Sequence, residues 1–538
     1  MINPETTKPT RISYSAMLAA ALGLISLLRV FYILWGPLDL SPDEALYWDC
    51  TRRPELSYYT KGPLIVYLML ISTHMFGTSV FGVRILAVVF SALSSLYLYK
   101  LCVSMFDASP DSPVTPVNRE GQFVGFTAAM LFQIIPLYAA YGVIFTIDSP
   151  FVYLWIASLY TFWKIISLEE RGKNAGYGLW ILLGILTGVG FMAKYIMAFF
   201  YICAFLFLIL TKNRRLLKTP KPYISFIVGI IALSPVIIWN AAHGWVTLKH
   251  TAGHAHVADG FKLLPLSLLE FTGSQLGVVT PVVLFLIIAA LFRLRGSQRG
   301  DFLFYFSIPV LLFFTLKSIQ GKVQANWAMT GYITGIAAAA WVYYKKEAFR
   351  ALSIHAKRTI VIGTAAALVV TIVGHFPVVL HLHPDNDPAS RLRGWREFGD
   401  RITTLYGELK QEGKAYPHGT EVLLVSDKYQ VTAEMAFYTQ GNPLVYCINL
   451  GRRVNEYDMW PGINEYAQKI RMSAPLRRID AVFATDGSQP LHPFVAFAFD
   501  RCEKTPLTVN ENGQILREYS IFKCYNFKGM IEVKPNTY

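Results

Sequence analysis

The sequence predicts a polytopic α-helical membrane protein that carries a soluble α/β domain at its C-terminal end. The 538 residues are 54% hydrophobic and only 16% charged, whereas soluble domains carry roughly 25% charged residues. Mean hydropathy is +0.39. Long apolar runs follow one another through the first part of the chain and stop near residue 384. We therefore divide the chain into a membrane domain, residues 1–383, and a C-terminal domain, residues 384–538.

A membrane-spanning helix needs about 20 mainly apolar residues, and about eleven stretches of the chain approach this requirement. They lie near residues 15–35, 83–104, 122–141, 149–167, 177–193, 195–211, 223–242, 273–293, 302–317, 326–344 and 359–380. The apolar run 64–77 is short for a span. We interpret it as a helix that lies at the membrane surface.

The charges of the loops predict the orientation. If the N-terminus is cytoplasmic, the most basic loops of the membrane domain all fall inside, as the positive-inside rule requires. These loops are 164–173, 212–221, 293–299 and 345–358. The opposite loops and the C-terminal domain are then extracytoplasmic. The net charge of +14 fits anionic membrane lipids as partners. Because no basic patch alternates with exposed aromatic residues, we do not expect nucleic-acid binding.

The C-terminal domain shows alternating helix and strand patterns. After a turn-rich linker, we expect helices at 395–412 and 431–439, and strands at 421–425, 443–448 and 479–484. This alternation predicts a small parallel sheet. No glycine-rich phosphate loop follows a strand, so the domain does not resemble a nucleotide-binding unit.

The six cysteines show no metal-binding spacing. Cys502 and Cys524 lie in the C-terminal domain, where an extracytoplasmic location permits a disulfide. Two unpaired thiols are an equal alternative.

Two adjacent carboxylates, Asp43 and Glu44, follow the first span directly, after Pro42. In a functional interpretation, one carboxylate accepts a proton from an attacking hydroxyl, and the other orients it or holds a cation. The structural alternative is that the pair only caps a helix. Both interpretations are compatible, because a capped helix end is also a rigid mount.

The next outer segment contains Tyr58, Tyr59 and Lys61 directly before the chain returns to an apolar run. The ammonium of Lys61 is suited to neutralising a phosphate at the bilayer surface, with snorkelling as the alternative. We name the two tyrosines as candidate substrate-binding residues.

Asp148 and Lys194 also lie at the outer ends of spans. An ionisable group at membrane depth is by default a candidate functional residue, and the alternative for Asp148 is an N-cap. No acid lies near Lys194 in the sequence, so we expect a bound anion as its partner.

The remaining candidates lie in two outer loops. His250, His254 and His256 are spaced so that the first two share a helix face, and His254 and His256 are candidate metal ligands. No local carboxylate completes a set of metal ligands. We therefore name no cofactor, and a divalent metal ion remains an alternative. His250 and His254 are alternatively substrate-binding or packing residues. Lys322 is a candidate for binding a sugar or phosphate, or belongs to an ordinary loop.

Lysines and acids thus converge on one face of the membrane. This combination suits a phosphate-bearing amphiphile, because lysines stabilise charge on a leaving phosphate while a carboxylate activates the nucleophile.

The order of the motifs resembles the polyprenyl-phosphate-sugar-dependent C-type glycosyltransferases, which include protein O-mannosyltransferases and the lipid A aminoarabinose and galacturonate transferases. The resemblance covers about residues 15–345. It rests on Pro42-Asp43-Glu44-Ala45, Tyr58-Tyr59-Thr60-Lys61-Gly62-Pro63, Phe81-Gly82-Val83-Arg84, Asp148-Ser149-Pro150 and the segment Gly188–Tyr195.

The resemblance implies inverting transfer of a sugar from a lipid phosphate, with undecaprenyl phosphate as the expected carrier, at the extracytoplasmic face of the bacterial inner membrane. It implies that Asp43 is the essential acid, that Lys61 and Lys194 meet the donor phosphate, and that Asp148 is the acid of the second outer loop. The lipid A aminoarabinose transferases carry a metal-binding glutamate where this chain has Thr60, which puts a metal in doubt. The long β-trefoil insertion of eukaryotic protein O-mannosyltransferases is absent.

We therefore expect a glycosyltransferase whose acceptor is a lipid A or lipopolysaccharide-type glycolipid, with protein hydroxyls as the second candidate. A transporter or lipid flippase is the competing class, and a non-catalytic scaffold is a third. A flippase predicts internal repeats and acids in the middle of spans, whereas the charged groups here lie at span ends.

Overall fold

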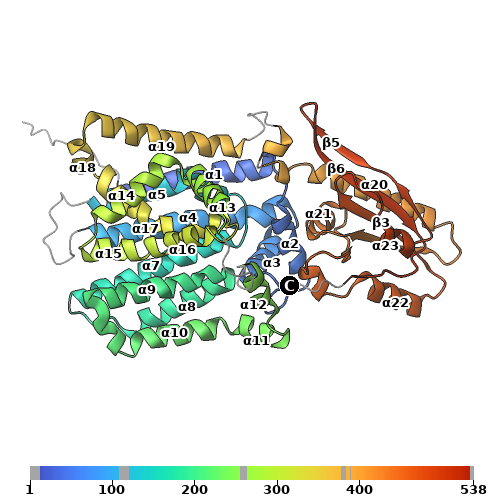
Figure 1. Ribbon diagram of the computed structural model, residues 1–538, viewed down its shortest axis with the longest axis horizontal. Helices are drawn as coiled ribbons and strands as arrows, with labels where there is room; N and C mark the ends of the chain where they lie inside the picture. Colours follow the sequence, from blue (N-terminus) through green and yellow to red (C-terminus); the bar gives the residue numbers. More distant parts are fainter. Residues whose placement is uncertain (1–12, 108–119, 255–262, 377–382, 388, 534–538) are drawn as a thin grey trace, which may run out of the picture.

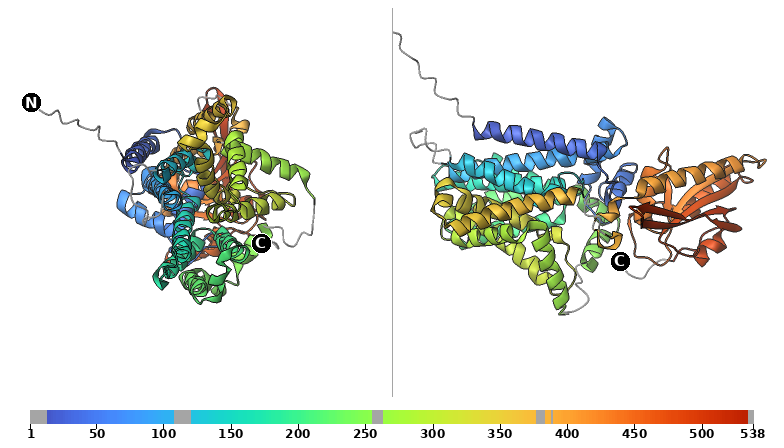
Figure 2. Two further views of the ribbon diagram at one scale, coloured as in Figure 1. Left: turned by 90° about the vertical axis from the view of Figure 1, so that its left-hand side faces the viewer. Right: turned by 90° about the horizontal axis from the view of Figure 1, so that it is seen from above.

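The computed structural model describes residues 13–107, 120–254, 263–376, 383–387 and 389–533. A bundle of roughly parallel helices forms one part of the molecule, and a domain that contains the β-sheet adjoins one end of the bundle (Figure 1). The view from above shows the same arrangement, with the sheet domain beyond the helix ends (Figure 2). The change in composition near residue 384 therefore coincides with a change from helical bundle to sheet domain.

Helices occupy each of the apolar runs that the sequence marks. In chain order they are α1 Tyr14–Trp35, α4 Val80–Phe106, α5 Glu120–Ile134, α6 Pro136–Ala140, α7 Asp148–Glu170, α8 Tyr177–Ala193, α9 Ala198–Leu210, α10 Lys221–Ala232, α11 Ser234–Ala242, α13 Pro265–Val279, α14 Pro281–Arg293, α15 Gln298–Tyr305, α16 Ile308–Ser318, α17 Thr330–Ala339 and α19 Ile354–His375. Short helices join them: α2 Pro42–Thr51, α3 Leu64–Phe76, α12 Val246–His254 and α18 Lys346–Ala351.

Several of these helices are shorter or more bent than simple spans. Within the described residues, five helices are long and apolar enough to cross a membrane, or up to eight if each bent pair counts as one span. The pair α10 and α11 bends by 50° and the pair α13 and α14 by 96°. Both α11 and α14 carry a proline in their first turn. Proline favours a helix start and opposes continuation of the preceding helix, which explains these breaks.

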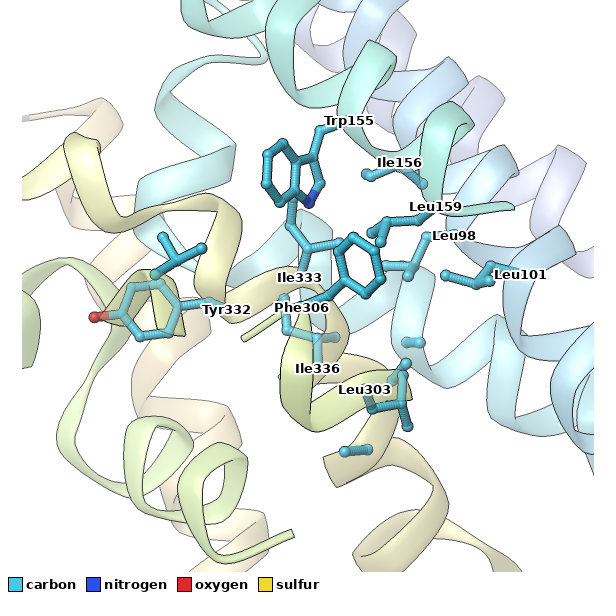
Figure 3. Packing of buried hydrophobic residues seen from close by; sticks show 14 of the residues in the cluster. Leu98, Leu101, Trp155, Ile156, Leu159, Leu303, Phe306, Tyr332, Ile333 and Ile336 are labelled. Carbon is cyan, nitrogen blue, oxygen red and sulfur yellow. The ribbon is translucent and has the colours of Figure 1, made fainter. Parts of the chain in front are cut away.

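The main core lies between helices that are far apart in the sequence. Leu98 of α4, Trp155 of α7, Phe306 after α15 and Ile333 of α17 are buried in one cluster (Figure 3).

The sheet of the C-terminal domain has the strand order β2-β1-β3-β6-β4, and β5 pairs with β6. The strands are β1 Thr420–Ser426, β2 Val445–Cys447, β3 Arg478–Asp486, β4 Arg501–Lys504, β5 Leu507–Glu511 and β6 Gln514–Tyr525. The accompanying helices are α20 Trp395–Gly413, α21 Tyr429–Tyr438, α22 Ile463–Ser473 and α23 Pro493–Ala498.

The prediction of a parallel sheet is correct only for the first three strands. Strand β1 pairs in parallel with β2 and β3, whereas β3 pairs antiparallel with β6, which also pairs antiparallel with β4 and β5. Strands β4, β5 and β6 were not predicted from the sequence. Cys502 of β4 and Cys524 of β6 face each other in the register and form a disulfide, which selects one of the two alternatives for these residues.

The segment that follows α1 packs against the C-terminal domain. Buried side chains of α2 and α3 share one cluster with side chains of α20, α21 and the sheet. Trp48 of α2 meets Phe437 of α21 edge to face, with ring centroids 5.0 Å apart. The Tyr438 hydroxyl accepts a hydrogen bond from Leu40 N at 2.8 Å. The segment that contains Asp43 and Glu44 is therefore held between the bundle and the sheet domain (Figure 1).

Candidate functional site

The two carboxylates begin α2 with a capping box. Ser41 is the N-cap, its hydroxyl accepts a hydrogen bond from Glu44 N, and the Glu44 carboxylate accepts one from Ser41 N. Pro42 provides a backbone angle suited to the first turn. The capping interpretation is therefore realised by Glu44. Asp43, one position earlier, is not part of this box.

Glu44 is fully buried and engaged on both oxygens. Arg84 Nε donates to its Oε1 at 2.9 Å and Arg84 Nη2 to its Oε2 at 2.8 Å, while Phe145 N also donates to Oε1 at 2.9 Å. The guanidinium of Arg84 further donates to the carbonyls of Leu38 and Asp39. These contacts join three segments of the bundle end. They engage both oxygens of Glu44 within the protein, and its catalytic role stays a prediction.

Asp43 faces an open cleft. Its side chain is half-buried and lines a cavity of about 680 Å³ between the start of α2 and the C-terminal domain. The Tyr429 hydroxyl donates to Asp43 Oδ1 at 3.4 Å. Asp43 is therefore held on the rigid first turn of α2 with an open path to its carboxylate.

Asp148 and Lys194 form a buried ion pair. Lys194 Nζ donates to Asp148 Oδ1 at 2.6 Å, and Asn326 Nδ2 donates to Asp148 Oδ2 at 2.8 Å. Asp148 starts α7 without acting as its N-cap. No acid lies near Lys194 in the sequence, and the structure supplies Asp148 as its partner from 46 residues away. The bound anion stays a prediction. The ammonium has three donor hydrogens, and only one is used in this hydrogen bond.

Lys61 lies near this pair. Gly62 packs so closely on the end of α8 that a Cβ atom there would stand 2.0 Å from the Met192 carbonyl oxygen. This close approach brings the Lys61 ammonium within electrostatic range of Lys194. In the part of the chain that the structure describes, Lys61 forms no ion pair. Two of the predicted phosphate-binding lysines therefore come together in space.

Two tyrosines lie close both to Asp43 and to the Asp148–Lys194 pair. The side chains of Tyr47 and Tyr141 each lie within electrostatic range of both Asp43 and Asp148. The predicted acid and the predicted phosphate-binding group thus belong to one region at the end of the bundle, although about a hundred residues separate the two acids in sequence.

Tyr58 and Tyr59 have a different setting from the one predicted. Their side chains are 2% and 0% exposed. The Tyr58 hydroxyl donates to the Arg53 carbonyl and accepts from Glu55 N, and the Tyr59 ring lies 4.9 Å from that of His250. We interpret both tyrosines as packing residues of the loop that carries Lys61.

Glu456 of the C-terminal domain holds the same loop. Its Oε2 accepts a hydrogen bond from Tyr59 N at 2.9 Å. The side chain is buried, and burial raises the pKa of this carboxyl from its usual value to about 8 because the charged form loses its hydration. Nothing in the local sequence marks Glu456, since its partner lies 397 residues earlier.

Of the histidine and Lys322 candidates, His250 packs on Tyr59 of the loop that carries Lys61. His250 is half-buried in α12, which ends at His254, and Lys322 is exposed. The side chain of His254 and the whole of His256 lie outside the described residues. Among the residues that are described, no group of three or more His, Cys, Asp or Glu side chains is arranged to hold a metal ion.

Comparisons with known proteins point in one direction. Residues 116–239 match the family model for dolichyl-phosphate-mannose-protein mannosyltransferases. The lipid A galacturonosyltransferase RgtD of Rhizobium johnstonii is 26% identical over 421 residues, which cover 77% of this chain and 80% of that protein. An undecaprenyl phosphate-α-4-amino-4-deoxy-L-arabinose arabinosyl transferase of Pseudomonas savastanoi is 26% identical over 198 residues, about a third of each chain.

A solved structure shares the fold. ArnT from Cupriavidus metallidurans, in a crystal structure with bound undecaprenyl phosphate, superimposes with a TM-score of 0.58 over 94% of this chain and 98% of its own length, at 13% identity. The apo form of the same protein gives a TM-score of 0.56. The helical bundle with a C-terminal sheet domain is therefore the ArnT-like arrangement. In sequence the chain is therefore similar to glycosyltransferases of the polyprenyl-phosphate-sugar-dependent C-type, and in fold it is similar to ArnT.

Proposed function

We propose that the protein transfers a monosaccharide from undecaprenyl phosphate to a lipid A-type glycolipid. The observation that carries this proposal is the joint placement of Asp43 on an open cleft and of Lys61 beside Lys194 at the same end of the bundle. The similarity to RgtD, which spans most of both chains, supports a glycolipid acceptor.

In the proposed reaction, an oxygen of the acceptor attacks the anomeric carbon from the face opposite the phosphate. The new carbon–oxygen bond forms while the bond from that carbon to the phosphate oxygen breaks, and its electron pair leaves with polyprenyl phosphate. Asp43 takes the proton of an attacking hydroxyl. Lys61 and Lys194 stabilise the charge that develops on the leaving phosphate. An acceptor phosphate is already ionised, and Asp43 would then orient it.

Glu44 has a positioning role in this scheme. With both oxygens engaged by Arg84 and backbone N–H groups, it fixes the turn on which Asp43 stands. Asp148 likewise orients Lys194 and does not take part in proton transfer.

The site is proposed to face the outside of the bacterial inner membrane, with the N-terminus in the cytoplasm. The basic loops on the opposite side support this orientation. The disulfide between Cys502 and Cys524 is independent support, since disulfides persist in oxidising compartments. We further propose that all of the roughly eleven apolar runs take part in the membrane domain, the bent pairs as broken spans, and that residues 384–538 form a water-exposed domain.

The test is transfer by the purified full-length protein from a labelled undecaprenyl-phosphate sugar to lipid A. The wild-type protein is expected to yield a new glycolipid. The Asp43→Asn variant is expected to lose about 10²- to 10⁴-fold in rate while its melting temperature is unchanged. A rate for Asp43→Asn equal to that of the wild type would refute the role of Asp43.

A protein hydroxyl is the second candidate acceptor, because the matching family model describes protein mannosyltransferases. Replacing lipid A with a peptide acceptor in the same assay separates the two functions. Relocation of the labelled lipid across proteoliposomes without any new glycoconjugate would instead indicate a flippase.

A further inference from the structure

The cleft beside Asp43 contains basic side chains that the proposed reaction does not use. Arg391, Lys428 and Arg517 line the cavity of about 680 Å³, together with the carboxylates of Asp43 and Asp486. The three cations come from separate segments of the C-terminal domain: the short turn before α20, the start of α21, and strand β6. They converge only because the domain folds.

These cations lack neutralising partners. Arg517 donates to the carbonyls of Arg393 and Ser390 and stacks on Trp395, which fixes its guanidinium without cancelling its charge. Arg391 and Lys428 are exposed. Among the described residues, none of the three cations is paired with a carboxylate. The wall that the C-terminal domain contributes therefore carries three positive charges against the single carboxylate of Asp486.

The N-terminus of α21 opens into the same cleft. Lys428 is its N-cap, and Tyr429, Gln430 and Val431 of its first turn line the cavity. This helix of ten residues has no side-chain cap and no acidic residue in its first turn. The first N–H groups of a helix lack intrahelical acceptors, and they bind anions together with the helix dipole. The three cations and the uncapped helix end form one anion site.

We infer that this site binds a phosphate group of the acceptor glycolipid, at a position other than the one that reacts. The inference rests on the proposed function and names the feature of the acceptor that the enzyme recognises. A cavity of this size holds a phosphorylated disaccharide, as ligand sites range over roughly 300–1,000 Å³. We assign the donor phosphate to Lys61 and Lys194, which lie at the bundle end beside α8 and α7. A protein acceptor that presents an uncharged hydroxyl would not require the three positive charges of this cleft.

The experiment compares a diphosphorylated lipid A with its dephosphorylated form as acceptors for the full-length protein. The double variant Arg391→Gln/Lys428→Gln is expected to raise KM for the phosphorylated acceptor on the order of tenfold. Its KM for the donor is expected to stay unchanged. The dephosphorylated acceptor is expected to show an already high KM that the variant does not alter. Restoring charge with Arg391→Lys/Lys428→Arg is expected to restore KM.

The matched control is Lys414→Gln/Lys469→Gln, which removes two exposed charges of the same domain outside the cleft. It is expected to leave both KM values unchanged. Inorganic phosphate is expected to compete with the acceptor. Competition with the donor, an equal rise in KM for both acceptors, or an unchanged KM in the cleft variant would each overturn the inference.

Binding of both lipid A forms is also measured without donor, on the immobilised full-length protein. This separates the inference from the proposed function. Absence of transfer by the wild-type protein to either acceptor would reject the proposed function, whereas cleft-dependent binding of the phosphorylated form would still support the anion site. Binding of the two forms with equal affinity would reject the anion site even where transfer is observed.

Discussion

The ion pairs Glu44–Arg84 and Asp148–Lys194 lie at the same end of the bundle and are both buried, yet they differ in how completely their atoms are used. Glu44 accepts two hydrogen bonds from Arg84 and two from backbone N–H groups. Arg84 also donates to two carbonyls. Lys194 donates one hydrogen bond to Asp148, and Lys61 lies nearby as a second cation.

This difference indicates different tasks. The Glu44 carboxylate accepts four hydrogen bonds and Arg84 uses four of its five N–H donors, so this pair is committed to holding segments together. A lysine with unused donors beside a second lysine is a ready site for a doubly charged group. Burial of a charged pair is weak evidence for either task. The two tasks are distinguished by whether the other donor and acceptor atoms of each ion pair are already hydrogen-bonded within the protein.

The largest effect is expected on breaking the Glu44–Arg84 pair. Glu44→Gln leaves the Arg84 charge buried without a counter-charge, and we expect a loss of about 3–5 kcal/mol in the free energy of unfolding. Thermal unfolding in detergent measures this. The neighbouring Asp43→Asn is the control, since Asp43 is half-buried on the open cleft. Equal melting temperatures for both variants would contradict a structural role for Glu44.

A smaller effect, in ligand affinity, is expected at the open pair. Lys194→Gln removes a charged donor for phosphate, and the dissociation constant of the polyprenyl-phosphate sugar should rise about tenfold to a hundredfold, as loss of a hydrogen bond to a charged group implies. Compared with Lys194→Gln alone, the double variant Asp148→Asn/Lys194→Gln should regain stability, but it should not regain affinity for the polyprenyl-phosphate sugar. The exposed Lys322→Gln serves as control. If Lys194→Gln bound donor as tightly as the wild type, its phosphate role would be excluded.

The close approach of Gly62 to α8 offers a test of the position of Lys61 relative to Lys194. Gly62→Ala forces the loop away from Met192, at a cost of roughly 1–3 kcal/mol, and moves Lys61 relative to Lys194. Donor KM should rise several-fold. Gly407→Ala in α20 is the control, since a Cβ atom there meets nothing within 4 Å. A normal donor KM for Gly62→Ala would show that Lys61 does not need this position.

The effect expected per pH unit is smallest for Glu456, which holds the loop before Lys61. Because the pKa of Glu456 is about 8 in the folded protein and about 4.3 in an unfolded chain, the folded state binds more protons between these values. Stability should therefore fall as pH rises from 5 to 8, by roughly 1 kcal/mol per pH unit. Glu456→Gln should flatten this dependence of the melting temperature. An unchanged slope in the variant would remove Glu456 as its source.

Much of the fold could be predicted from the sequence. Long apolar runs specify helices because each run satisfies its own backbone hydrogen bonds within lipid, and every run contains helix. The first three strands of the sheet were also correctly predicted. The bends at α11 and α14 were missed although prolines mark them, because hydropathy averages over a window and does not register a change of direction.

The order of apolar runs and loops along the chain predicts that five ionisable residues end apolar segments on one side: Asp43, Glu44, Lys61, Asp148 and Lys194. Only the tertiary structure decided what each of them contacts. Glu44 became an anchor through Arg84, 40 residues away, and Lys194 gained Asp148 as partner across 46 residues. Asp43 alone of the acidic pair reaches the cleft, because the C-terminal domain completes its wall. Partners of ionic groups are set by long-range packing, which local sequence does not encode.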